Sequence, residues 1–197
     1  MTAFIELKSP KERFARSINV EYDTDGSALD GYIPVGRTVD AVSRIARGLA
    51  NGQAESAFSV TGPYGSGKSS FAVLLDALFG PATEPSRTTA HELIRTVSPE
   101  VAQLVEEARN SYGVHKSGFI RAVITAEREP IAVTVLRALM HGVERFGPPA
   151  KTKGPLNSAA NDLREMHAAF AASPSVLPDS LNVKSVVASL AECAPVL

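Results

Sequence analysis

The segment Gly62-Pro63-Tyr64-Gly65-Ser66-Gly67-Lys68-Ser69 constrains this chain of 197 residues more than any other feature. It matches in full the pattern G-x-x-x-x-G-K-[ST], in which a glycine-rich turn leads from a strand into a helix. Glycine adopts positive φ angles and has no Cβ, so successive backbone amides can turn inward and surround an anion. The positive end of the following helix adds to this preference. The segment therefore predicts a phosphate-binding loop.

Each part of this loop has a role that its chemistry explains. The backbone amides would surround the phosphates, and the Lys68 ammonium would reach the β- and γ-phosphates, so Lys68 is the one candidate catalytic residue. The Ser69 hydroxyl would ligate Mg²⁺, and Ser70 would be a further donor. The nucleotide-binding residues expected in the loop are Gly62, Pro63, Tyr64, Gly65, Ser66, Gly67, Lys68, Ser69 and Ser70.

The segments around the loop predict an alternation of strands and helices. Residues 57–62 and 119–125 are short apolar runs typical of strands, and residues 68–79 have apolar side chains at helical spacing. Further helices are expected over 38–51, from Ser98 and from Pro130, two of them marked by a proline in the first turn. Strands that follow helices in this way fit right-handed crossovers and a parallel sheet.

A second segment extends this interpretation into a family resemblance. Tyr32-Ile33-Pro34-Val35-Gly36-Arg37, the helix after it, the loop and Arg121-Ala122-Val123-Ile124 together resemble the start of an ASCE P-loop ATPase. The resemblance is above all to AAA+ modules of the origin-recognition and STAND-like kind in large bacterial ATP-binding proteins. It covers about residues 30–145 and the very C-terminus. It implies a three-layer α/β/α P-loop NTPase fold with a parallel sheet, ATP and Mg²⁺ as cofactors, and packing of Gly36 and Arg37 against the adenine.

The sequence departs from this family in one respect. The family has a Walker B strand, an apolar run that ends in Asp-Glu, and no apolar run of this chain does. Glu127 is the nearest candidate, and we interpret it as a loop carboxylate; Asp76 lies two turns along the helix from Lys68. We therefore expect an N-terminal arm (1–31) and a P-loop domain (32–197) truncated before Walker B. Such a chain would bind MgATP, with hydrolysis to ADP and phosphate only in a longer parent.

Two other functions stay open at this point. A P-loop kinase acting on a small acceptor would need an arginine over the phosphates, from Arg128 or Arg145, and its turnover would depend on the acceptor. A non-catalytic, nucleotide-dependent interaction switch would bind without turnover even in the parent chain. The choice of ATP over GTP depends on the resemblance and on the lack of an N-K-x-D sequence.

The composition excludes several other classes of protein. There are 20 Lys and Arg residues against 21 Asp and Glu, with 44% hydrophobic residues, which excludes a polycationic nucleic-acid coat and an intrinsically disordered chain. The basic residues form no convincing nucleic-acid footprint, although a local patch would be enough. The four histidines have no ligand spacing, so no metal beyond Mg²⁺ is expected.

The expected compartment and partners follow from the remaining features. Cys193 is the single cysteine, which favours a reducing compartment, and no apolar run reaches the length of about 18 residues typical of a membrane span. The first residues lack the apolar core of a signal peptide. We expect a cytoplasmic protein with no membrane contact, whose partners are the nucleotide and either a second copy or another protein that completes the sheet.

Overall fold

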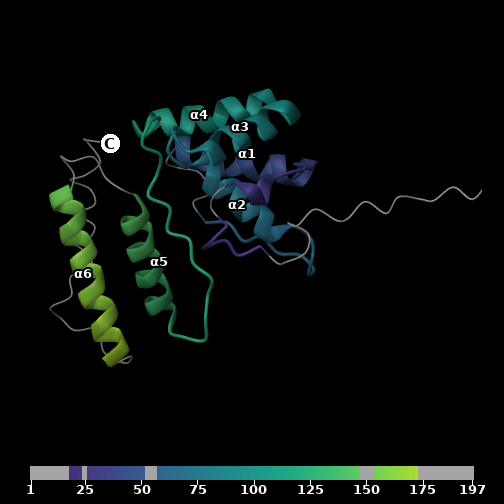
Figure 1. Cartoon of the computed structure of the whole chain (residues 1–197). Helices are drawn as coiled ribbons and strands as arrows, with labels where there is room; N and C mark the ends of the chain where they lie inside the picture. The colour runs from purple at the N-terminus through teal and green to yellow at the C-terminus, as the bar shows by residue number, and fades with distance from the viewer. Residues whose placement is uncertain (1–17, 24–25, 52–56, 147–152, 173–197) are drawn as a thin grey trace, which may run out of the picture.

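The computed structural model describes residues 18–23, 26–51, 57–146 and 153–172, and these residues form helices joined by irregular segments. Figure 1 shows α1 to α4 gathered in one group, with α5 and α6 side by side next to it. In chain order the elements are the 3-10 helix η2 (Ser27–Leu29), α1 (Gly36–Asn51), α2 (Lys68–Leu78), α3 (Pro85–Val97), α4 (Pro99–Ser111), α5 (Ile131–Phe146) and α6 (Lys153–Ala172).

The expected three-layer α/β/α fold is wrong for this structure. Across the described ranges there is no β-strand, and therefore no parallel sheet. The two segments expected as strands, 57–62 and 119–125, are non-helical but belong to no ladder. The described part of the chain is helical, and the helices pack directly on one another.

The segment 119–125 shows why strand-like residues do not make a strand here. Its backbone groups bond elsewhere: Phe119 N–H donates to Phe79 O at 2.9 Å, and Thr125 N–H donates to the Glu21 carboxylate. Arg137 Nη2 donates to Thr125 O at 3.3 Å. A β-ladder requires a second strand in register, and an apolar run by itself does not supply one.

The helices are predicted better, because their signals are local. α1 and α2 occupy the expected ranges, and α4 begins after Ser98, whose side chain accepts a hydrogen bond from Val101 N–H. The sequence also predicts a helix of about two turns capped by Thr89; α3 is longer and begins at Pro85, so Thr89 lies inside it and donates to Pro85 O. The sequence also predicts helices near 10–18 and 182–193 and a strand from 194, and these ranges fall wholly or mostly outside the described residues.

The core lies between α2 and the helices around it. Leu74 and Leu78 of α2 are completely buried, as are Ile94 of α3 and Val105 of α4. Leu29 of η2, in the expected N-terminal arm, belongs to the same core cluster. None of the described helices combines the length and the apolar character that a membrane crossing requires.

Gly80 and Gly118 let the C-terminal end of α2 lie against the segment after α4. Gly118 has φ 72°, and a Cβ on it would lie 2.4 Å from the carbonyl carbon of Gly80. Such a contact requires glycine for both its φ angle and its lack of a side chain. It places residues 118–119 directly beside the C-terminal end of α2.

Arg109 of α4 binds the same end of α2 from within the core. Its guanidinium is fully buried and donates to Leu78 O at 3.2 Å, to Gly80 O at 2.7 Å and to His115 O at 2.8 Å. Burial, with a smaller contribution from Arg87, lowers the Arg109 pKa below its ordinary value. Its charge lies where the helix dipole of α2 is negative, which is the favourable end for a cation.

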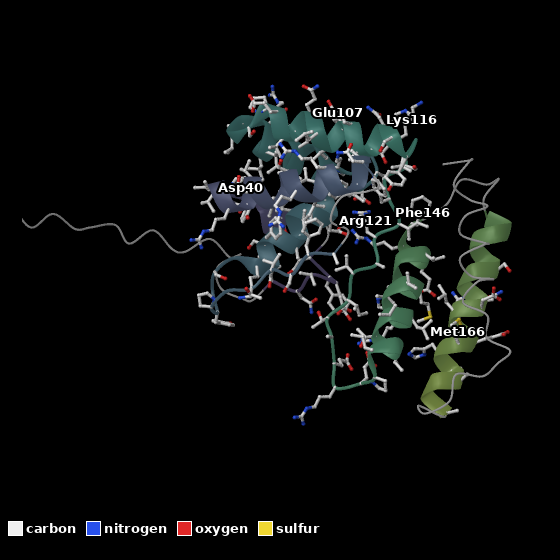
Figure 2. The ribbon with its side chains drawn as sticks, turned by 180° about the vertical axis from the view of Figure 1, so that it is seen from behind. Asp40, Glu107, Lys116, Arg121, Phe146 and Met166 are labelled. Atoms are coloured by element: carbon white, nitrogen blue, oxygen red, sulfur yellow. The ribbon has the colours of Figure 1, made fainter. Side chains whose placement is uncertain are left out.

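Asp76 joins α2 to two more arginines. Its buried carboxylate accepts from Arg145 of α5 at 2.7 and 3.0 Å and from Arg121 at 3.1 Å. Arg121 also donates to Glu84 at 2.7 Å. Figure 2 shows Arg121 between the α1–α4 group and α5. This charge cluster fixes α5 to the end of α2.

The Gly118 contact can be tested with two alanine variants. Gly113→Ala introduces a residue at φ 67° with open space around it, so we expect a loss of about 1 kcal/mol from the strained backbone alone. Gly118→Ala has the same strain at φ 72° and a clash with Gly80 as well, so we expect a loss of at least about 3 kcal/mol. Urea unfolding measures both, and equal losses would contradict the close contact.

Candidate phosphate-binding site

The glycine-rich loop that the sequence predicts to bind phosphate connects the non-helical segment 57–63 to the first turn of α2. Gly65 and Gly67 have φ angles of 77° and 83°, the left-handed conformation that glycine adopts without strain. Gly67 is the N-cap of α2, and its carbonyl accepts from Phe71 N–H at 2.9 Å. The helix therefore starts at Lys68, as the sequence predicts, with its free amides at the loop.

The loop closes tightly on itself around Lys68. The Lys68 ammonium donates to Gly62 O at 2.9 Å, to Pro63 O at 2.7 Å and to the Ser66 hydroxyl at 3.4 Å. A Cβ on Gly62 would lie 2.9 Å from Ser66 Oγ, so a side chain at this position would require the exposed Ser66 side chain to move. The ammonium thus lies within the turn, held by three acceptors of the loop itself.

A cavity of about 440 Å³ opens beside the loop, and residues of both sequence motifs line it. Part of its wall comes from the loop and from Lys68, and part from the segment around Val35 and Arg37 at the start of α1. The lining residues are Tyr32, Ile33, Val35, Arg37, Thr38, Ala41, Val60, Thr61, Gly62, Pro63, Ser66, Gly67, Lys68 and Phe71. Arg37 and Lys68 are cations, and no described residue of this wall is acidic.

The remaining expected site residues are not among those that line this cavity. Tyr64 is 95% exposed at the tip of the loop, and Gly65 beside it is also exposed. Ser69, the expected Mg²⁺ ligand, is exposed in the first turn of α2, and Ser70 is half-buried. Gly36 begins α1 between two lining residues.

One polar contact in the wall of the cavity has no signal in the local sequence. The Tyr32 hydroxyl lies 3.2 Å from Thr38 Oγ1, and either group can donate. This bond joins the segment before α1 to the first turn of that helix. The sequence predicts Thr38 as the cap of this helix, but α1 begins at Gly36, so the Thr38 side chain contacts Tyr32 instead.

The other charged candidates are engaged elsewhere. Glu127 is 68% exposed and pairs with Arg137 Nη1 at 3.0 Å. Arg145, one of the two arginines that a kinase would need over the phosphates, is held by Asp76 near the opposite end of α2. Arg128 is exposed in the segment before α5. None of these residues lines the cavity beside the loop.

Comparisons with family models, with curated proteins and with solved structures found no match for this chain. A function for the cavity is therefore inferred only from the residues that line it.

The surface position of the Lys68 bonds can be tested without any ligand. Lys68→Met removes three bonds to exposed acceptors that water can replace, so we expect the unfolding free energy to change by less than about 1 kcal/mol. Arg109→Met also removes three hydrogen bonds, but from the core, and should cost about 2 to 4 kcal/mol. Urea unfolding compares the two variants. A loss for Lys68→Met as large as that for Arg109→Met would contradict a site built apart from the core.

Proposed function

We propose that this chain binds the magnesium complex of a nucleoside triphosphate, ATP, with its phosphates at the loop Gly62–Ser69. The observation that supports this most is the charge of the cavity wall. Its described residues include Arg37 and Lys68 and no carboxylate, and the amino end of α2 opens onto it. A wall with two cations and free helix amides attracts a polyanion.

The residues present fit a triphosphate. Gly65 and Gly67 have the positive φ angles that let successive amides face one ligand. Lys68 would exchange its bonds to loop carbonyls for bonds to phosphate oxygens. Ser69 would supply one oxygen ligand to Mg²⁺, a metal that usually keeps several waters and binds substrate phosphates.

The apolar part of the cavity is suited to the rest of the nucleotide. Ile33, Val35, Val60 and Phe71 line it together with Tyr32. An apolar wall that ends in a few polar groups is the usual form of a small-molecule site. The choice of adenine over guanine rests on the resemblance to AAA+ modules.

Thermal unfolding with and without nucleotide tests this proposal. At 100 times its dissociation constant a ligand stabilises the fold by about 2.7 kcal/mol. For a chain of this size that corresponds to a rise in melting temperature of about 5 to 10 °C. We expect MgATP to produce this rise in the wild type and not in Lys68→Ala, because the variant loses the cation at the phosphates.

Lys116→Ala is the matched control for this experiment. Lys116 is exposed beyond the C-terminal end of α4 (Figure 2), and it does not line the cavity. Its variant should therefore retain the full MgATP shift. MgGTP in parallel measures the choice of base. An unchanged melting temperature of the wild type with both nucleotides would overturn the proposal, and so would equal shifts in wild type and Lys68→Ala.

A further inference from the structure

We infer that Arg37 binds the phosphate chain of the ligand and thus forms a second cationic subsite in the cavity that Lys68 also lines. This inference rests on the proposed function and goes beyond it. The resemblance to AAA+ modules implies packing of Arg37 against the adenine, and the structure favours a different role.

Two helices begin at the same cavity. Arg37 is the second residue of α1 and Lys68 is the first residue of α2, and both line the same cavity. Val35 and Gly67, the residues that precede these helix starts or cap them, line it as well. Two helices of 16 and 11 residues therefore begin at one cavity with a cation in the first turn of each.

Both helix ends carry a cation where the helix dipole is positive. The amino end of a helix has a partial positive charge, so acidic residues are favoured in the first turn and cations there are unfavourable. The first turns of α1 and α2 contain no acidic residue, and each contains a cation. In the described part of the chain Arg37 has no ion pair that would balance its charge. An anion between the two helix ends would balance Arg37, Lys68 and both dipoles at once.

The apolar wall of the cavity gives the base a place to pack that does not involve Arg37. The cavity already has an apolar wall, formed by Ile33, Val35, Val60 and Phe71, against which a base can pack. A guanidinium has five N–H donors and forms charge-assisted bonds to phosphate oxygens. The chemistry of the wall thus separates into an apolar part for the base and a cationic part for the phosphates, and Arg37 belongs to the cationic part.

Magnesium tripolyphosphate, a ligand without base or ribose, separates the two roles of Arg37. We expect Arg37→Gln to weaken binding of both MgATP and magnesium tripolyphosphate by about tenfold, as measured by isothermal titration calorimetry. Arg37→Lys retains the charge and should restore most of the affinity for both ligands. Arg47→Gln is the matched control, because it removes the same exposed charge from α1 outside the cavity and should leave both affinities within twofold.

The outcomes distinguish this inference from the proposed function. If Arg37→Gln weakens MgATP but leaves tripolyphosphate unchanged, Arg37 contacts the base or ribose and the inference is overturned. The same holds if neither affinity changes while Lys68→Ala abolishes both, and in these two cases the proposed function stands. If the wild type binds neither ligand, both proposals fail. Circular dichroism melting checks that each variant folds; Arg37→Gln should not lower the melting temperature, since it removes a cation from the positive end of a helix.

Discussion

A buried guanidinium at the C-terminal end of α2 organises the described structure. Arg109 is fully buried and donates to the carbonyls of Leu78, Gly80 and His115, so it joins the C-terminal end of α2 to the turn that follows α4. Removing it would leave the buried carbonyls of Leu78 and Gly80 without this donor, which costs more than the net value of the bonds. Asp76 extends the same attachment to α5 through Arg145.

The two ends of α2 therefore have different surroundings. The C-terminal end is embedded among arginines and the close glycine contact, and its position is fixed by the core. The amino end begins at an exposed loop, where the first amides and Lys68 lie at the surface of a cavity. Cations stand at both ends, but only at the C-terminal end do they match the helix dipole. The mismatch at Lys68, and at Arg37 on α1, is what an anionic ligand would relieve.

The sequence predicts the parts of this structure that depend on neighbouring residues. The loop, the start of α2 at Lys68 and the cap of α4 at Ser98 all follow from signals within a few positions. The contacts of Asp76 were not predictable in this way, because Arg145 lies 69 residues further along the chain. The expected sheet failed for a related reason. Residues 119–125 have the composition of a strand, but a ladder depends on a distant partner, and here their backbone bonds to Phe79 and Glu21 instead.

The three hydrogen bonds of the Lys68 ammonium affect which anions could bind at the loop. All three of its N–H groups already have acceptors, at Gly62, Pro63 and Ser66. An incoming anion competes with these acceptors and must offer several oxygen atoms within reach to displace them. A chloride ion is a single acceptor centre, whereas a phosphate chain presents many oxygens along its length. In the proposed complex, a phosphate chain with many oxygen atoms would replace these acceptors more completely than a single small anion would.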